Sequence, residues 1–446
     1  MTSVLSQSPS LEHAERPVER EIPTAAPVPR EKPARLVSLD AYRGAIMLFM
    51  ASGGLALPAV AKSFPDDPIW SPIWRYLAFN TDHVPWAGRH SLWDLIQPSF
   101  MFMVGVAMPY SIASRRAKGD SEKKIFAHVL YRAIVLVLLG IFLSSNGSRG
   151  STNFTFVNVL TQIGLGYAFL YLLLGRGLRV QMGVLAVILI GYWLLFFLWP
   201  LPDANFDYRT VGWKADWQGL PGWLAHWDKN TNAAAAFDKW FLNLFPPAVG
   251  KPFRFNDGGY QTLNFVPSLG TMLLGLMAGE MLRSPKGKWR KLGWLLAAAA
   301  VCGALGWLAG EFVCPIIKRI WTPSWVLYSA GGTFAMLAGF FWIIDIVGWK
   351  RWAFPLVVVG MNSIAMYCMA QLMKGWVGNS LRIHLGPLAL PSLSHIVQPL
   401  LAMMNVTVDP VWLNNTFGPI TQAAAVLLVL WLICLWMYRR GVFLRI

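Results

Sequence analysis

Long apolar segments are the feature of this 446-residue chain that most restricts its fold. A helix that crosses a lipid bilayer needs roughly 20 apolar residues, and its backbone must satisfy its own polar groups because no water is present there. About ten segments are long and apolar enough: 42–61, 92–113, 125–145, 155–174, 181–200, 264–282, 292–312, 326–346, 354–373 and 418–438. The sequence therefore predicts an all-α polytopic membrane protein, a bundle of about ten transmembrane helices.

The composition favours the same fold class. Hydrophobic residues make up 55% of the chain and charged residues 13%, whereas a soluble domain carries about 25% charged residues. The net charge of +16 comes from Lys and Arg scattered between apolar segments, which indicates topology signals rather than a nucleic-acid site. The four cysteines show no metal-ligand spacing. We therefore expect membrane lipids as partners, no nucleic acid and no metal.

Basic residues mark every second connection between the apolar segments. They are Arg115, Arg116, Lys118, Lys123, Lys124, Arg176, Arg179, Arg283, Lys286, Lys288, Arg290, Lys291, Lys350, Arg351, Arg439 and Arg440. The positive-inside rule makes these connections and both termini cytoplasmic. The prediction is a disordered cytoplasmic tail at 1–38 and a transmembrane domain at 39–446. The larger extracytoplasmic loops of this domain are expected at 62–91, 201–263 and 374–417.

The loop 201–263 is rich in Trp, Asp, Asn and Gly. Aromatic faces beside carboxylates and amides are suited to holding a sugar, but a cap packed on the bundle explains the composition equally well. Elsewhere, the GxxxG steps Gly275–Gly279 and Gly306–Gly310 permit close approach of helices. We expect them to pack helices within the chain rather than between protomers.

Several polar residues fall inside the apolar segments, where they usually face a bundle interior or a wet cavity. Asn158 and Gln162 share one helix face, and Asn362 lies well inside its segment. These amides suit a polar chamber, although hydrogen bonds between helices are an equal alternative. Glu280 and Asp345 lie near basic clusters and are expected to pair with them.

Two residues near the start of segment 92–113 stand out as candidates for chemistry. His83 precedes the segment, and an imidazole exchanges a proton near neutral pH. Asp94 ends the sequence Ser91-Leu92-Trp93-Asp94, which is the capping-box pattern of a helix start. Asp94 could also orient a histidine, as the acid of a catalytic triad does, and the two roles are compatible. His90 is interpreted as a histidine of an interfacial loop.

A resemblance to a known family rests on several ordered motifs. The sequence Arg35-x-x-Ser38-x-Asp40-x-x-Arg43-Gly44 resembles the opening of membrane acyltransferases. The stretch His83-x-x-Trp86-x-Gly88, followed by Asp94-Leu95-Ile96-x-Pro98-x-Phe100-x-Phe102, resembles the signature of heparan-α-glucosaminide N-acetyltransferase and its bacterial relatives. Further matches follow in order at Val159–Gly164, Ser268–Thr271 with Gly275 and Gly279, and Gly360–Ile364.

The resemblance implies an enzyme that uses cytosolic acetyl-CoA to acetylate an amino sugar on the far side of the membrane. It places the essential histidine at His83 and implies a homodimer. Animal members carry an additional lumenal domain before the bundle, where this chain has only a tail, so a bacterial inner membrane is the expected location. The family often has an Asn late in the first helix, where this chain has Ser52.

The predicted site follows from these motifs. His83 and Asp94 are its catalytic residues, and Arg43 and Arg132 are expected to bind the phosphates of acetyl-CoA, because guanidinium suits phosphate. The expected contacts for the substrate are Trp86, Asn158, Gln162, Asn264 and Asn362. O-acetylation of an envelope glycan keeps the same mechanism with another acceptor. The alternative class is a transporter or a sugar-binding membrane protein without acyl transfer.

Overall fold

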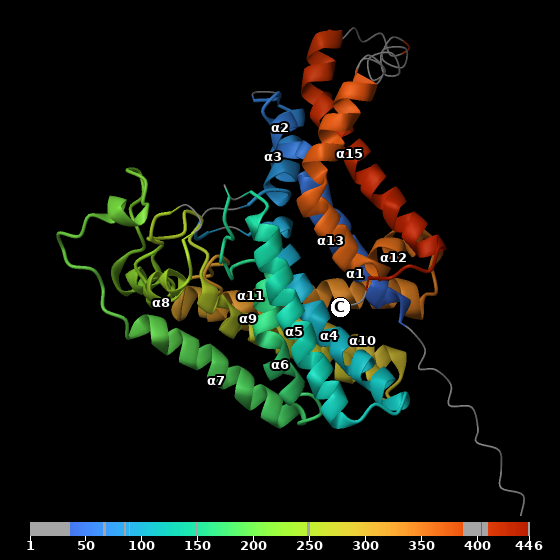
Figure 1. Ribbon diagram of the computed structural model, residues 1–446, viewed down its shortest axis with the longest axis horizontal. Helices are drawn as coiled ribbons and strands as arrows, with labels where there is room; N and C mark the ends of the chain where they lie inside the picture. Colours follow the sequence, from blue (N-terminus) through green and yellow to red (C-terminus); the bar gives the residue numbers. More distant parts are fainter. Residues whose placement is uncertain are drawn as a thin grey trace, which may run out of the picture. The chain divides into compact units, whose positions relative to one another are not determined.

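Helices follow one another along most of the chain in the computed structural model, which describes residues 36–65, 68–83, 86–88, 90–147, 150–247, 250–386, 403 and 409–444 (Figure 1). The longer helices are α1 (Val37–Ser52), α3 (Trp70–Asn80), α4 (Ile96–Ala117), α5 (Glu122–Ser145), α6 (Val159–Leu172), α7 (Leu178–Phe197), α9 (Phe265–Arg283), α10 (Lys288–Phe312), α11 (Pro323–Phe341), α13 (Ser363–Leu372) and α15 (Pro410–Arg439). The shorter ones are α2 (Leu57–Ala61), α8 (Ala233–Phe241) and α12 (Phe354–Met361). The described residues contain no strand, so the all-α class is confirmed.

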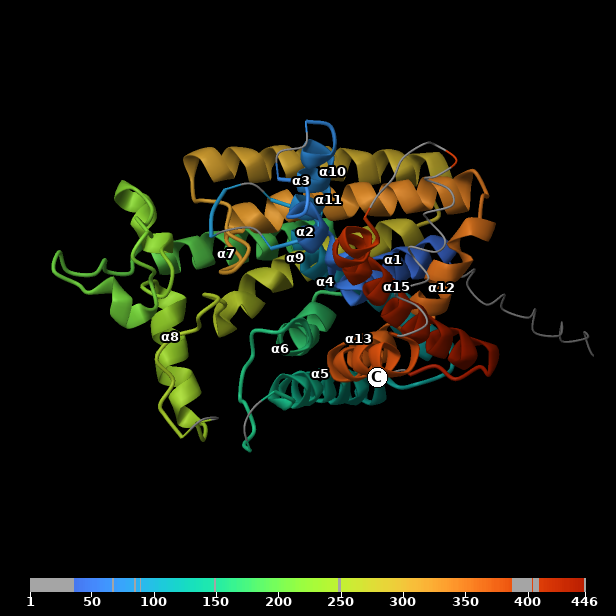
Figure 2. The ribbon, with the colours of Figure 1, turned by 90° about the horizontal axis from the view of Figure 1, so that it is seen from above.

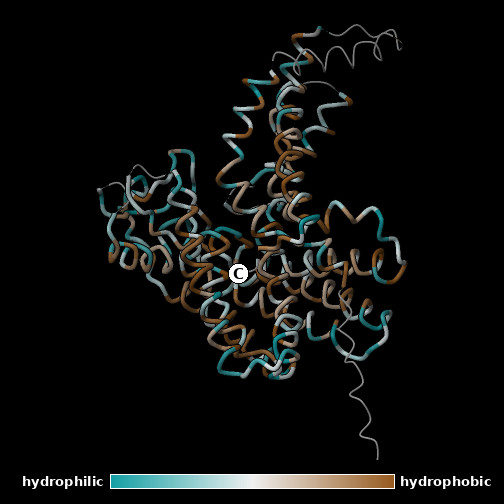
Figure 3. Tube along the Cα trace, turned by 45° about the vertical axis from the view of Figure 1, so that its right-hand side comes forward, coloured by the Kyte–Doolittle hydropathy of each residue, from teal (hydrophilic) through white to brown (hydrophobic). Residues whose placement is uncertain are grey.

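Eight helical stretches of the described residues are long and apolar enough to cross a membrane. All ten predicted segments coincide with helices, but two of them depart from simple spans. Segment 354–373 is broken into α12 and α13, which are bent by 69°. Segment 155–174 forms the 14-residue helix α6, which at 1.5 Å per residue is only about 21 Å long. Figure 3 shows the apolar colouring along the helices and hydrophilic colouring at many connections.

The ends of the predicted segments also shift. The predicted tail 1–38 lies outside the described residues up to residue 35, and α1 already begins at Val37. The predicted loop 374–417 is helical from 374 to 386, and α15 begins at Pro410. The residues between these two helices lie largely outside the described part of the chain. The cytoplasmic position of the termini stays a prediction.

Glycine allows the central helices to touch backbone to backbone. A Cβ atom on Gly275 of α9 would lie 2.0 Å from the carbonyl oxygen of Phe102 on α4, and one on Gly105 of α4 would lie 1.9 Å from that of Met272. Gly306 of α10 approaches Tyr328 of α11 equally closely, and Figure 2 shows α10 and α11 side by side. The predicted packing of these glycines within the chain is therefore confirmed.

Residues 201–263 form a cap of short helices and loops that packs on the bundle. Trp227 is 1% exposed and clusters with Tyr192 and Phe196 of α7 and with Ile317 of the α10–α11 connection. The cap also buries Asp238 of α8, whose carboxylate oxygens accept the Thr262 N–H at 3.0 and 3.2 Å. Of the two interpretations of the Trp-rich loop, the structure thus supports the cap that packs on the bundle.

The buried Asp238 carboxyl should make the stability of the cap depend on pH. Burial raises its pKa to about 6, whereas an aspartate in an unfolded chain titrates near 3.9. The folded state therefore holds the proton more tightly, so this contribution to stability is fully present below about pH 4 and is lost as the pH rises through about 6. Hydrogen exchange of residues 233–264, corrected for the intrinsic exchange rate, should be faster at pH 8 than at pH 5.

Asp238→Asn removes the charge and keeps an oxygen that accepts from Thr262. The variant should lose much of the difference in stability between pH 5 and pH 8, which is about 1.4 kcal/mol for a pKa of about 6. Asp228, whose pKa burial raises to about 7, should leave a residual dependence of the same sign. An unchanged pH dependence in the variant would contradict the assignment to Asp238.

Candidate functional site

Side chains from four parts of the chain meet in one small pocket, which we call the His83 pocket. It contains about 240 Å³ of space free of atoms. Its lining residues are His83, Trp86, His90, Asp94, Tyr260, Lys318 and Arg319. They come from the α3–α4 connection, the start of the α4 span, the end of the cap and the α10–α11 connection. The pocket thus joins three of the predicted residues to three charged or phenolic groups that were not predicted.

The surroundings of His83 favour an imidazole that accepts a proton. The Trp93 indole N–H donates to His83 Nε2 at 3.3 Å, and because an indole N–H can only donate, Nε2 carries the lone pair in this arrangement. Partial burial lowers the pKa of His83, and the Lys318 ammonium lowers it further, whereas Asp94 raises it. Both effects favour the neutral imidazole near pH 7, which can accept a proton.

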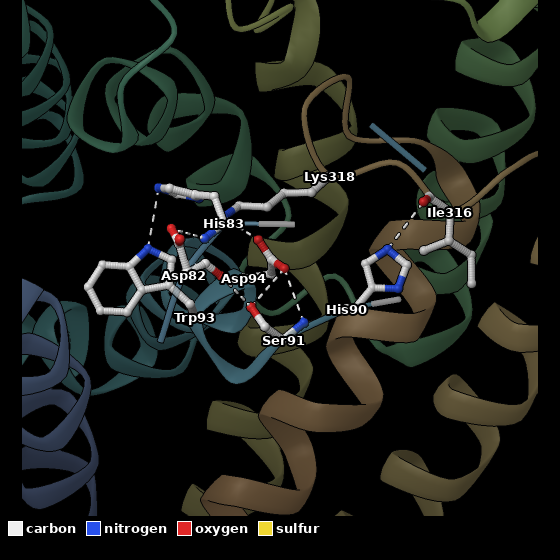
Figure 4. Close-up of polar contacts among 8 residues, drawn as sticks. All are labelled: Asp82, His83, His90, Ser91, Trp93, Asp94, Ile316 and Lys318. Atoms are coloured by element: carbon white, nitrogen blue, oxygen red, sulfur yellow. Dashed lines mark hydrogen bonds and ion pairs between the residues drawn. The ribbon is translucent and has the colours of Figure 1, made fainter. Parts of the chain in front are cut away.

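Asp94 is 1% exposed, and each of its two carboxylate oxygens has a polar partner. Its Oδ2 accepts the Ser91 backbone N–H at 3.1 Å, so the predicted capping box is present at this helix start. Its Oδ1 lies 3.0 Å from Lys318 Nζ, and this ion pair is almost completely buried (Figure 4). The carboxylate therefore bonds to a lysine from a distant connection, and the predicted contact with His83 is electrostatic rather than a hydrogen bond.

The α10–α11 connection that carries Lys318 is fixed by hydrogen bonds. Thr322 accepts the Ile317 backbone N–H through its hydroxyl at 3.0 Å and returns its own N–H to the Ile317 carbonyl. The Asn264 side-chain amide donates to the Arg319 carbonyl at 2.7 Å. The buried Trp321 has a φ of 50°, a left-handed backbone conformation that costs energy for a non-glycine residue. Such a constrained loop places the Lys318 ammonium accurately.

His90 lines the same pocket but is turned away from His83. Its Nε2 lies 3.2 Å from the Ile316 carbonyl oxygen, and its ring packs beside Trp325 and Tyr328. Burial lowers its pKa. Figure 4 shows the ring directed toward Ile316, away from the Asp94–Lys318 pair. His90 thus lies in a connecting loop, as predicted, and its place at the membrane interface stays a prediction.

Trp86 is the predicted substrate contact that does line the pocket. It is 4% exposed, and its indole N–H donates to the Trp227 carbonyl at 3.2 Å. Its ring meets Trp217 edge to face at 5.9 Å. One side of the pocket is thus an aromatic wall that the cap holds in place.

The predicted amides lie elsewhere and bond to neighbouring helices, the cap and connecting segments. Asn158 caps α6 and donates to the Gly140 carbonyl and the Ser144 hydroxyl of α5. Gln162 donates to the Gln261 carbonyl of the cap at 3.3 Å, and its own carbonyl oxygen has no partner in the described residues.

Asn362 closes the break between α12 and α13. Its amide donates to the Val442 carbonyl, and its carbonyl oxygen accepts the Leu444 N–H. None of Asn158, Gln162, Asn264 and Asn362 lines the His83 pocket. Of these amides, Asn158 bonds between two helices as in the interhelical alternative, whereas the others bond to backbone groups of connecting or terminal segments.

The predicted phosphate-binding arginines are also apart from the pocket. Arg43 of α1 pairs with Asp40 at 3.6 Å, and the Arg132 guanidinium of α5 lies 4.9 Å from the centre of the Tyr167 ring. The structure does not bring Arg43 and Arg132 to a common pocket with His83.

A second, wider pocket lies near the other end of α4, and we call it the Arg283 pocket. It has about 710 Å³ of space free of atoms. Its lining residues are Pro109, Ile112, Ala113, Arg116, Leu174, Gly175, Glu280, Arg283 and Ser284. Glu280 accepts there from the Gly175 N–H and from Gln181, so its partners are neutral donors rather than the predicted basic cluster. Arg283 donates to the Pro109 carbonyl.

Sequence reasoning missed Lys318 and Arg319, although a signal was available. The two cations lie in the short connection 313–322 between apolar segments. By the predicted topology this connection is a short extracytoplasmic one, where the positive-inside rule leads one to expect few Lys and Arg. Because Lys318 and Arg319 depart from the positive-inside pattern, the topology does not explain them, and they become candidates for a role in the site.

Comparisons with known proteins agree with the motifs. Human heparan-alpha-glucosaminide N-acetyltransferase is 24% identical over 379 residues, which cover 75% of this chain and 52% of the human protein. The mouse protein of the same name is 23% identical over 340 residues, covering 65% of this chain and 50% of the mouse protein. This chain thus matches about half the length of these relatives. No family model matches the chain, and the described residues hold no cluster of three metal-ligating side chains.

Proposed function

The chain is related to the heparan-alpha-glucosaminide N-acetyltransferases, and on this premise we propose that it is a transmembrane acetyltransferase. The proposed reaction moves the acetyl group of acetyl-CoA to an amino sugar or an envelope glycan. The observation that carries the proposal is the position of the His83 imidazole in a polar pocket beside Asp94 and Lys318, where burial lowers its pKa and favours a base. The bacterial inner membrane and a homodimer are further parts of the proposal.

The chemistry follows from the position of His83. The acceptor nitrogen or oxygen attacks the thioester carbonyl carbon while His83 Nε2 takes the proton from the acceptor. The carbon–sulfur bond then breaks, and the CoA thiolate leaves and is protonated by the imidazolium. In the alternative route Nε2 attacks the thioester first and passes the acetyl group on. The weak Trp93 bond to Nε2 must be given up in either route.

The acetyl donor has a proposed place at the basic end of the bundle. The Arg283 pocket offers Arg116 and Arg283 to phosphate groups, and Arg43 and Arg132 remain proposed contacts. The two pockets lie near the two ends of the α4 span. Asp94 and Ile112 are about 27 Å apart along the helix axis at 1.5 Å per residue. A long donor that enters at one end and reacts near the other is consistent with this arrangement.

Transport is the rival function, because polar pockets at both ends of a bundle also suit a carrier. Transporters commonly contain broken helices in corresponding positions of two repeats. The described residues contain one bent pair, α12 and α13, and it lies away from the residues of both pockets. The relatedness to acetyltransferases therefore favours the enzyme.

The proposal is tested with the full chain in proteoliposomes. Acetyl-CoA labelled in its acetyl group is supplied on one side and glucosamine on the other, and labelled N-acetylglucosamine is measured by chromatography. We expect acetylated sugar only when both substrates are present. Uptake of unmodified glucosamine without acetyl-CoA would instead support the transporter. Absence of transfer to glucosamine and to de-N-acetylated envelope glycan would overturn the proposal.

A further inference from the structure

We propose that Lys318 is a positioning residue of the candidate site. Its ammonium fixes the buried Asp94 carboxylate, anchors the connection that carries His83, and holds the imidazole in its proton-accepting form. This inference rests on the proposed function for its catalytic meaning, but the charge coupling that it describes can be measured without acetyl transfer.

The first support is the geometry of the Asp94–Lys318 pair. Lys318 Nζ lies 3.0 Å from Asp94 Oδ1, with side chains that are 7% and 1% exposed. Removing two charges from water is expensive, and such a pair often contributes little net stability. The pair joins residues 224 positions apart in the sequence and lies directly at the pocket. Because the buried pair is expected to add little stability, its position is better explained by an effect on the charge of the neighbouring His83.

A chain of contacts leads from the ion pair to His83. Asp94 Oδ2 accepts from the Ser91 N–H, and the Ser91 hydroxyl lies 2.9 Å from the Asp82 carbonyl oxygen. The Asp82 carboxylate accepts the backbone N–H of His83 at 2.7 Å. Hydrogen bonds through Ser91 and Asp82 therefore link the ion pair to the residue that carries the imidazole (Figure 4).

The charges around His83 decide its protonation. Lys318 and Arg319 disfavour the imidazolium, while Asp94 and Asp82 favour it. His90 and Tyr260 complete the titratable groups of the pocket. Of the charged neighbours, Lys318 has the largest influence on the pKa of His83, and it lowers it. Since Lys318 also occupies one oxygen of Asp94, the same ammonium limits how far that carboxylate can stabilise a protonated imidazole.

The test measures the titration of His83 directly. Carbethoxylation of His83 by diethylpyrocarbonate, which reacts with the neutral imidazole, is followed by peptide mass spectrometry between pH 5 and 9 in the purified full chain. Lys318→Gln removes the charge and retains a donor for Asp94, and we expect it to raise the pKa of His83 by about one unit. Lys318→Arg should leave the titration near that of the wild type.

Two further variants keep the result interpretable. Asp94→Asn leaves the ammonium without its partner and should move the pKa of His83 downward, opposite to Lys318→Gln. Lys239→Met removes an exposed charge from the cap and should have no effect. If Lys318 only braces the loop, Lys318→Gln will change thermal stability but leave the titration unchanged. An unchanged titration in Lys318→Gln and Asp94→Asn overturns the proposal, and so does a shift of the wrong sign in either variant.

The acetyltransferase function and the role of Lys318 can be disproved independently. A wild-type protein without acetyl transfer contradicts the proposed function, yet the titration still decides the role of Lys318. Where transfer is present, Lys318→Gln should lower kcat/KM several-fold near pH 6 and much less near pH 8.5, because a raised pKa moves the acid limb of the profile to higher pH. Equal losses at both pH values would contradict the inference and leave the enzyme assignment intact.

Discussion

Replacing His83 with alanine should lower acetyl transfer by about 10²–10⁴-fold, the range that a general base contributes. The variant loses the only imidazole in the described residues that both lines the pocket and accepts a hydrogen bond through Nε2 from Trp93. If His83 forms an acetyl intermediate instead, the loss should be at least as large. The measurement is the initial rate of labelled acetyl transfer in proteoliposomes at saturating acetyl-CoA.

His128→Ala supplies the matched control for this variant. His128 lies on α5, away from the residues of both pockets, so its removal should leave the rate within a factor of about two. Binding of acetyl-CoA should survive in His83→Ala, because the proposed phosphate contacts lie at the other end of the bundle. A His83→Ala protein that transfers acetyl groups at the wild-type rate would remove the imidazole from the mechanism.

Gly275→Ala is expected to cause a large loss of stability in the bundle. The added methyl group would lie 2.0 Å from the Phe102 carbonyl oxygen, and that oxygen belongs to the α4 backbone, so it cannot move aside alone. The helices α4 and α9 must separate, which costs about 3 kcal/mol in a well-packed core. The thermal midpoint of the detergent-solubilised protein, measured by size-exclusion chromatography, should fall clearly.

Gly293→Ala makes the same chemical change where space is available. Gly293 lies on α10 with no atom within 4 Å of an added Cβ, and alanine favours a helix over glycine by about 1 kcal/mol. Its midpoint should be unchanged or higher. Because α4 and α9 each contribute residues to the Arg283 pocket, Gly275→Ala should also weaken acetyl-CoA binding. Equal midpoints for the two variants would contradict the close contact of these helices.

The helices could be predicted from the sequence because apolar length is a local property. Each predicted segment contains a helix, since twenty apolar residues in lipid have almost no other way to satisfy their backbone. The departures arise from interactions that are not local. The break at Asn362 depends on a hydrogen bond to Val442, 80 positions away.

The candidate site was predictable in part. His83, Asp94 and Trp86 could be found because they lie close together in the sequence and fit one motif. Lys318 could not be paired with Asp94 in this way, because nothing in the sequence relates positions 224 residues apart. The buried amides show the opposite error. Asn158 and Gln162 do lie inside the bundle, but a side chain that must satisfy its own hydrogen bonds is often committed to neighbouring helices rather than to a substrate.

The contact of Asn362 with Val442 and Leu444 has a practical consequence for handling the protein. Both polar atoms of the amide are satisfied by backbone beyond the last helix, and leaving a buried amide unsatisfied costs about 1–3 kcal/mol. A change that displaces Val442 or Leu444 would therefore leave the Asn362 amide unsatisfied at the break between α12 and α13. Fusions near these residues are best separated from them by a flexible spacer.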